Sequence, residues 1–182
     1  MSTTSTPKTS DSSPFNIHLR IKTEGENLLL IKSISTLLEE IILKNKKKKY
    51  KINKDSFFSD KTPSLSLYEY IASTVKNTKI SMSTLIISIV SITTLMKKIK
   101  NSICKNNIYK LIITSIFLHS KFYEDQNHSL KLFSQAGRIN YEELYQLEIQ
   151  YYILCEYSLL VKENIFEQYF NFFQNKAEKM KL

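Results

Sequence analysis

Glycine and proline are scarce in this sequence, with two glycines and three prolines among 182 residues. Sandwiches and barrels need many tight turns, and those turns use glycine and proline, so the scarcity argues against both architectures. Long helices with few breaks are the favoured alternative. A phosphate-binding loop needs several glycines close together, so nucleotide-binding loop motifs are also excluded.

Metal sites and catalytic sets lack the residues that they would need. Cys104 and Cys155 do not form a CxxC pair, and the three histidines have no metal-ligand spacing. We therefore expect no metal and no cofactor. With so few histidines, no nucleophile, base and orienting group can be assembled, so we do not expect an enzyme or a small-molecule substrate. Both cysteines are interpreted as buried apolar residues in a reducing compartment.

Neither a secretory signal nor a membrane span is expected. The first residues, MSTTSTPKTSDSSP, contain no basic region followed by an apolar run. The longest uncharged stretch, residues 80–96, is diluted by serine and threonine and is shorter than the roughly 20 apolar residues of a membrane span. We expect no membrane partner, and a location in the cytoplasm, the nucleus or both.

Positive charge is concentrated in one segment. Residues 44–54 carry seven lysines and no acid, in a chain with a formal net charge of +9. Such a run can bind nucleic acid, act as a nuclear import signal or solvate a loop. A charge block in one loop has no defined element that reads bases, so a solvated loop is favoured and nucleic acid is not expected as a partner.

The N-terminal part of the chain is predicted to contain one helix. Residues 1–27 are rich in serine, threonine and proline and are predicted to be a disordered tail. Residues 28–56 are predicted to hold a helix at 28–43 and then the lysine-rich loop. Apolar residues at helical spacing give this helix a face that can dock: Leu30, Ile34, Leu37, Leu38 and Ile41.

After Pro63, helical signals predict a bundle of five helices. Ser66 and Glu69 form a capping box, which marks the start of the first helix. The third helix is apolar on every side, so it is expected to be enclosed by the others. Residues 174–182 are expected to fray. The predicted helices lie at about 66–76, 81–98, 107–122, 140–154 and 165–173.

Three segments of this bundle resemble the cyclin box of P-type cyclins, which are also called U-type. They are KNTKIS, ITSIFLHSKFYED and GRINYEELYQLEIQYYILCEYSLLV, and they occur in the family's order with its gaps. The resemblance covers residues 57–173. It implies an all-α fold, a five-helix box around a central buried helix with an additional N-terminal helix.

The resemblance also implies a function and a site. A cyclin binds and activates a cyclin-dependent protein kinase by positioning the kinase's regulatory helix, and is not itself an enzyme. Lys121 and Glu148 match the pair that holds main-chain groups of that helix. By the same matching, an apolar groove would be formed by Leu118, Phe122, Tyr152, Tyr157 and Leu159.

Two alternatives remain open from the residues themselves. Lys121 and Glu148 can be ordinary surface charges, and the tyrosines can belong to the core. The chain can also be a cyclin-box-like helical adaptor, or a nucleic-acid-binding protein associated with transcription, which the lysine run would support.

Overall fold

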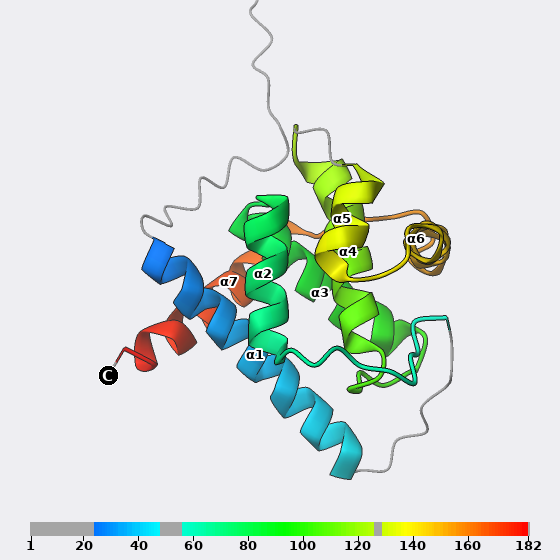
Figure 1. Ribbon diagram of the computed structural model, residues 1–182. Coiled ribbons are helices and arrows are strands. Elements are labelled where there is room, and N and C mark those ends of the chain that lie inside the picture. Colours follow the sequence, from blue (N-terminus) through cyan, green and yellow to red (C-terminus); the bar gives the residue numbers. More distant parts are fainter. Residues whose placement is uncertain (1–23, 48–55, 126–128, 182) are drawn as a thin grey trace, which may run out of the picture.

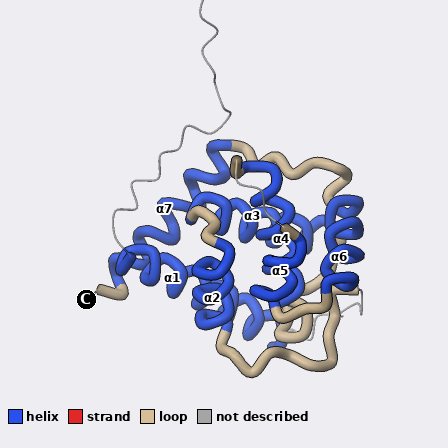
Figure 2. The backbone as a smooth tube through the Cα atoms, turned by 45° about the horizontal axis from the view of Figure 1, so that its top comes forward, coloured by secondary structure: helices blue, strands red, loops and turns tan. Residues whose placement is uncertain are grey.

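The computed structural model describes residues 24–47, 56–125 and 129–181. These ranges contain seven helices and no strand (Figure 2), which confirms the all-α prediction. None of the helices in the described ranges is both long and apolar enough to cross a membrane. The helices are α1 (Glu24–Lys47), α2 (Leu67–Thr78), α3 (Met82–Lys98), α4 (Ile108–Tyr123), α5 (Leu130–Gly137), α6 (Tyr141–Leu154) and α7 (Glu163–Lys179).

The central element is α4, which contacts α2, α3, α5 and α6 (Figure 1). Every residue from Leu111 to Ser120 is buried. Because neighbours cover it on all sides, α4 has no need of a polar face, and its sequence is apolar throughout its middle. The prediction of an enclosed third helix is confirmed.

One helix was not predicted. The stretch expected to hold five helices holds six, because α5 lies between α4 and α6. The Ser129 hydroxyl caps its start by accepting from the Leu132 amide, and Phe133 packs against Phe117 with ring centroids 5.0 Å apart. With eight residues, α5 completes about two turns, which is too short for an apolar period to stand out from the surrounding loop.

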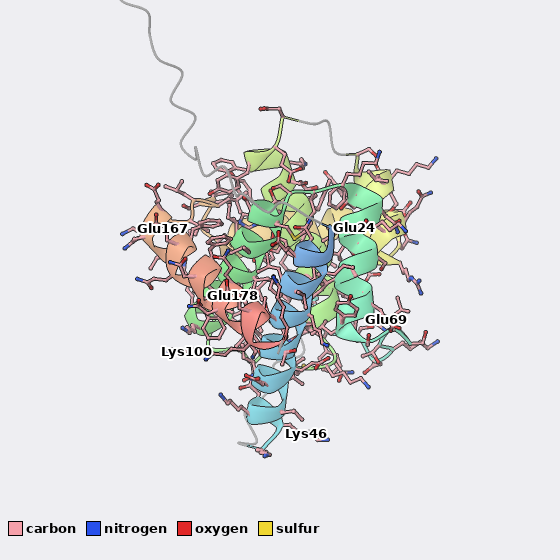
Figure 3. All side chains as sticks on the ribbon, turned by 90° about the vertical axis from the view of Figure 1, so that its left-hand side faces the viewer. Glu24, Lys46, Glu69, Lys100, Glu167 and Glu178 are labelled. Atoms are coloured by element: carbon pink, nitrogen blue, oxygen red, sulfur yellow. The ribbon has the colours of Figure 1, made fainter. Side chains whose placement is uncertain are left out.

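The N-terminal helix docks on the bundle as predicted. It packs against α7 on one side and α2 on the other (Figure 3), and it buries Leu30, Ile34 and Leu38. Its bounds are wider than the predicted 28–43. Acidic residues in the first turn and lysines in the last turn complement the helix dipole, so the helix extends at both ends into segments without apolar period.

At the other end of the chain, α7 continues to Lys179, which corrects the expectation that residues 174–182 fray. Ala177 is buried against the bundle, and Lys176 forms an ion pair of 2.9 Å with Glu40 of α1. This packing orders a segment that is polar in sequence. Most of the tail expected at 1–27, and residues 48–55 of the lysine-rich loop, lie outside the described residues.

Gly137 is a close-packing position at the end of α5. A Cβ atom at this position would lie 2.4 Å from Cγ1 of Ile113, which is in the buried part of α4. We expect Gly137→Ala to destabilise the fold by about 1–3 kcal/mol, the usual cost of overpacking a core. Urea unfolding of the two proteins would measure it.

The matched control for this substitution is Gly25→Ala in the first turn of α1, where an added Cβ meets nothing within 4 Å. It should be neutral or slightly stabilising, because alanine is a better helix former than glycine. Equal stabilities of Gly137→Ala and the parent would contradict the expectation.

Candidate functional site

An open groove of about 560 Å³ lies between the C-terminal end of α4, the outer face of α6 and the segment that follows α6. All seven residues that the sequence singled out line it: Leu118, Lys121, Phe122, Glu148, Tyr152, Tyr157 and Leu159. Leu118 and Leu159 are buried and form the floor. Phe122 and Tyr157 are 55% and 66% exposed, so large aromatic surfaces face solvent at its walls.

Three further lining residues were missed by the sequence analysis: Tyr145, Ile149 and Ile153, which are exposed on α6. They recur every four residues, which is a helical period. The signal was hidden because α6 carries a second apolar face, on which Leu144, Leu147 and Tyr151 are buried. One face fills the core, and the other gives the groove its apolar length.

Lys121 and Glu148 form an ion pair within the groove. Lys121 is in the last turn of α4 and Glu148 is in the middle of α6, and the Lys121 Nζ atom lies 2.5 Å from Glu148 Oε1. The same ammonium group lies 4.8 Å from the centre of the Phe117 ring. The Lys121 side chain is 46% exposed but that of Glu148 only 16%, so Glu148 is more covered than a surface carboxylate.

Buried hydrogen bonds fix the rotation of α6 about its axis. The Tyr151 hydroxyl donates to Ser115 Oγ of α4 at 3.1 Å and lies 2.9 Å from Ser91 Oγ of α3. The Ser115 hydroxyl in turn donates to the Ser88 carbonyl. Burial raises the pKa of Tyr151 well above its usual range, so the phenol stays neutral. With Tyr151 held inward, the opposite face of α6 points to the groove.

The end of α6 is a Schellman motif without glycine. The Glu156 amide donates to the Ile153 carbonyl and the Tyr157 amide to the Tyr152 carbonyl, at 2.8 and 3.0 Å. Glu156 has a φ of 53°, a left-handed conformation that costs a non-glycine residue roughly 1 kcal/mol. The motif brings the rings of Tyr152 and Tyr157 together edge to face, with centroids 5.3 Å apart.

Tyr123 holds the segment that supplies the groove floor. Its hydroxyl donates to the Leu159 carbonyl at 3.2 Å and accepts from the Val161 amide at 3.1 Å. The ring of His119 stacks on Tyr123, with centroids 6.1 Å apart. Tyr123 therefore ties the chain after α6 to the end of α4, which places Leu159 beside Leu118.

His119 is a packed core residue of α4. It is fully buried, and its Nδ1 atom donates to the Ser115 carbonyl at 2.7 Å. Burial lowers the pKa of His119 to about 4, although the hydrogen bond to Ser115 opposes the shift. The imidazole is therefore neutral at physiological pH.

This buried imidazole predicts sensitivity to acid. In the unfolded chain the histidine has a pKa near 6.5. Between pH 6.5 and pH 4 the unfolded state therefore binds a proton that the native state does not bind. Stability is therefore lost as the pH falls through this range, by about 2 kcal/mol between pH 7 and pH 5. Urea unfolding at the two pH values, for the parent and His119→Gln, would measure the part due to His119. The same loss in both proteins would contradict the assignment.

Comparison with known proteins identifies the family of the chain. Residues 28–159 match the family model described as Cyclin. Cyclin-U1-1 of Arabidopsis thaliana is 22% identical over 153 residues, which are 81% of this chain and 73% of that protein. Cyclin-U2-1 of the same plant is 27% identical over 146 residues, 78% of this chain and 66% of that protein.

Over a shorter stretch the identity is higher. PHO85 cyclin-6 of Saccharomyces cerevisiae is 38% identical over 64 residues, 35% of this chain and 15% of that protein. The chain thus spans about two thirds to three quarters of the two plant relatives and a small part of the yeast one. The family match over 28–159, together with these relatives, shows that the chain belongs to the cyclin family and to its U or P type.

Proposed function

We propose that the chain is a regulatory subunit that binds and activates a cyclin-dependent protein kinase through the groove between α4 and α6. The observation that carries the proposal is the Lys121–Glu148 pair set among exposed aromatic side chains. Membership of the cyclin family supports a regulatory rather than a catalytic role.

The shape and chemistry of the groove suit a helix of the partner. An amphipathic helix binds by laying apolar side chains into a groove, and aromatic residues dominate the desolvated centres of protein interfaces. Phe122, Tyr152 and Tyr157 provide the aromatic surface, and Leu118 and Leu159 provide an apolar floor. We expect the kinase's regulatory helix to occupy this space.

The charged pair would fix the position of that helix. A free helix end exposes main-chain carbonyl and amide groups that need partners. The Lys121 ammonium can donate to a carbonyl and the Glu148 carboxylate can accept from an amide. Such charge-assisted bonds are stronger than neutral ones. The two residues already contact each other in the free subunit, so both are held near the place where the helix end would lie.

Activation would follow from differential binding. The kinase has one form with its regulatory helix turned inward and one with the helix turned outward. If the groove binds the inward form more tightly than the outward form, the equilibrium shifts to the inward, active form. The nucleotide, the metal ions and the catalytic aspartate all belong to the kinase. We expect the complex of this chain with its kinase to act in the cytoplasm, the nucleus or both.

Two relatives are named as cyclins of PHO85, which makes PHO85 of Saccharomyces cerevisiae a suitable first probe kinase. The test would combine the purified full chain with PHO85 and with the cyclin-dependent kinases of its own organism. We expect one of them to bind and to gain protein kinase activity. Phe122→Ala and Tyr157→Ala should each weaken binding about tenfold, as for interface anchors.

The matched control is Phe172→Ala on α7, where a ring that is 47% exposed lies outside the groove. It should bind like the parent. Failure of every kinase in the panel to bind the folded chain would overturn the proposed function. Equal binding by the groove variants and the control would overturn the groove as its site.

A further inference from the structure

Left-handed residues end four helices of the described chain, and none of them is glycine. Lys79 follows α2, Lys100 follows α3, Arg138 follows α5 and Glu156 follows α6, with φ between 52° and 57°. Three of these ends share one hydrogen-bond pattern. At α3, the Lys100 amide donates to the Lys97 carbonyl and the Asn101 amide to the Met96 carbonyl. The ends of α5 and α6 have the same pair of bonds.

Charge sets Glu156 apart from the other three. A helix C-terminus carries a partial negative charge, so a cation is favourable at this position and an anion is unfavourable. Lys79, Lys100 (labelled in Figure 3) and Arg138 follow this rule. Glu156 breaks it, and it also adopts a conformation that glycine would adopt without strain.

Contacts within the chain do not compensate for these two costs. Lys98 of α3 lies 2.8 Å from the Glu156 carboxylate, but the two side chains are 43% and 77% exposed. Ion pairs at this exposure contribute little to stability, because water and salt screen them. The folded subunit alone therefore gains little from a glutamate at position 156. Residues that break local rules without compensation are expected at functional positions.

Glu156 lies beside the groove, and this location indicates a role in binding the partner. It directly precedes Tyr157 of the groove wall, and it also lines a neighbouring cavity of about 340 Å³ between α3 and the segment that follows α6. Leu159 lines both the groove and the cavity, so the two lie next to each other. A partner that fills the groove and extends past Tyr157 would pass over the Glu156 carboxylate.

We propose that Glu156 is an acidic contact that receives a lysine or arginine side chain of the partner bound in the groove. This inference rests on the proposed function and adds the chemistry of a second point of contact. The hydrogen-bonded turn fixes the backbone of Glu156 relative to that of Tyr157, so the two side chains would leave the chain side by side. On binding, the cation of the partner would replace Lys98.

Three variants separate this role from a structural one, with binding measured to whichever panel kinase binds the parent. Glu156→Gln should weaken binding about fivefold and make the affinity less dependent on sodium chloride, because charged contacts are screened by salt. Glu156→Gly should raise the thermal midpoint by about 2 °C, since it removes strain and repulsion, and still weaken binding. Lys98→Ala should bind as tightly as the parent or more tightly, because it frees the carboxylate.

Lys100→Gly is the matched control, because it relieves strain at the same position of the same motif on α3. It should raise the thermal midpoint without changing the affinity. Parent-like affinity and salt dependence of Glu156→Gln would overturn the proposal. If Lys98→Ala lost as much kinase affinity as Glu156→Gln, the proposal would also be overturned, because the ion pair would then act by holding the turn.

These outcomes are distinct from failure of the proposed function. If the groove variants Phe122→Ala and Tyr157→Ala weaken kinase binding and Glu156→Gln does not, the regulatory role stands and only the acidic contact is wrong. If no kinase of the panel binds the parent, both are wrong.

Discussion

Deletion of α1, residues 24–47, is expected to leave a chain that no longer unfolds cooperatively. The helix buries four aliphatic side chains against α2 and α7: Leu30, Ile31, Ile34 and Leu38. Burial of each contributes about 1.5–3 kcal/mol. Their sum is comparable to the entire stability of a typical domain, about 5–15 kcal/mol. Thermal melting followed by circular dichroism would show a broad, early transition.

Single substitutions on α1 would refine this result. Ile34→Ala should cost about 2–5 kcal/mol, because it opens a cavity in a fully buried site. Leu43→Ala, at a residue that is 57% exposed on the same helix, should change stability by less than about 0.5 kcal/mol. A deletion variant that melted at the midpoint of the parent would mean that α1 does not belong to the cooperative unit.

Lys121→Ala and Glu148→Ala are each expected to weaken kinase binding by about 1.5–3 kcal/mol, which is roughly ten- to a hundredfold in affinity. The reason is the loss of charge-assisted bonds to main-chain groups of the partner. Both variants should stay folded, because Lys121 is half exposed and Glu148 keeps some access to water. Kinase activation should fall with binding. Circular dichroism and titration against the partner kinase would measure the two properties separately.

The molecule supplies a control on the same two helices. Lys110 and Glu143 form an ion pair of 2.7 Å between the starts of α4 and α6, outside the groove. Lys110→Ala and Glu143→Ala should leave kinase affinity unchanged. If Lys121→Ala and Glu148→Ala fold and bind like the parent, these residues are surface charges. If both unfold, their pair is structural.

Helix starts and buried faces were predictable because each has a local cause. The capping box of Ser66 and Glu69 is present, with the Ser66 amide 2.9 Å from Glu69 Oε2, and α2 begins at the next residue. The apolar run of α4 required enclosure by other helices, and the structure provides it. Each of these features can be inferred from fewer than twenty consecutive residues.

Features that depend on tertiary packing could not be predicted in the same way. The end of α7 is ordered because Ala177 is buried and because Lys176 pairs with Glu40 of α1, which is more than 130 residues away in sequence. The low exposure of Glu148 depends on its contact with Lys121 of another helix. The positions of the groove residues followed from the family resemblance, but their individual exposures required the fold.

The packing of α1 against α7 has a consequence for how the protein is made. Among the described helices, a ribosome completes α1 first and α7 last, yet these two helices pack against each other. Until α7 emerges, the face of α1 that carries Leu30 and Ile31 lacks part of its cover. Nascent chains with exposed apolar faces are prone to aggregate. Emergence of α7 is therefore the step that completes the packing of the described helices. Chains that stop before residue 163 should be substrates of chaperones and proteases.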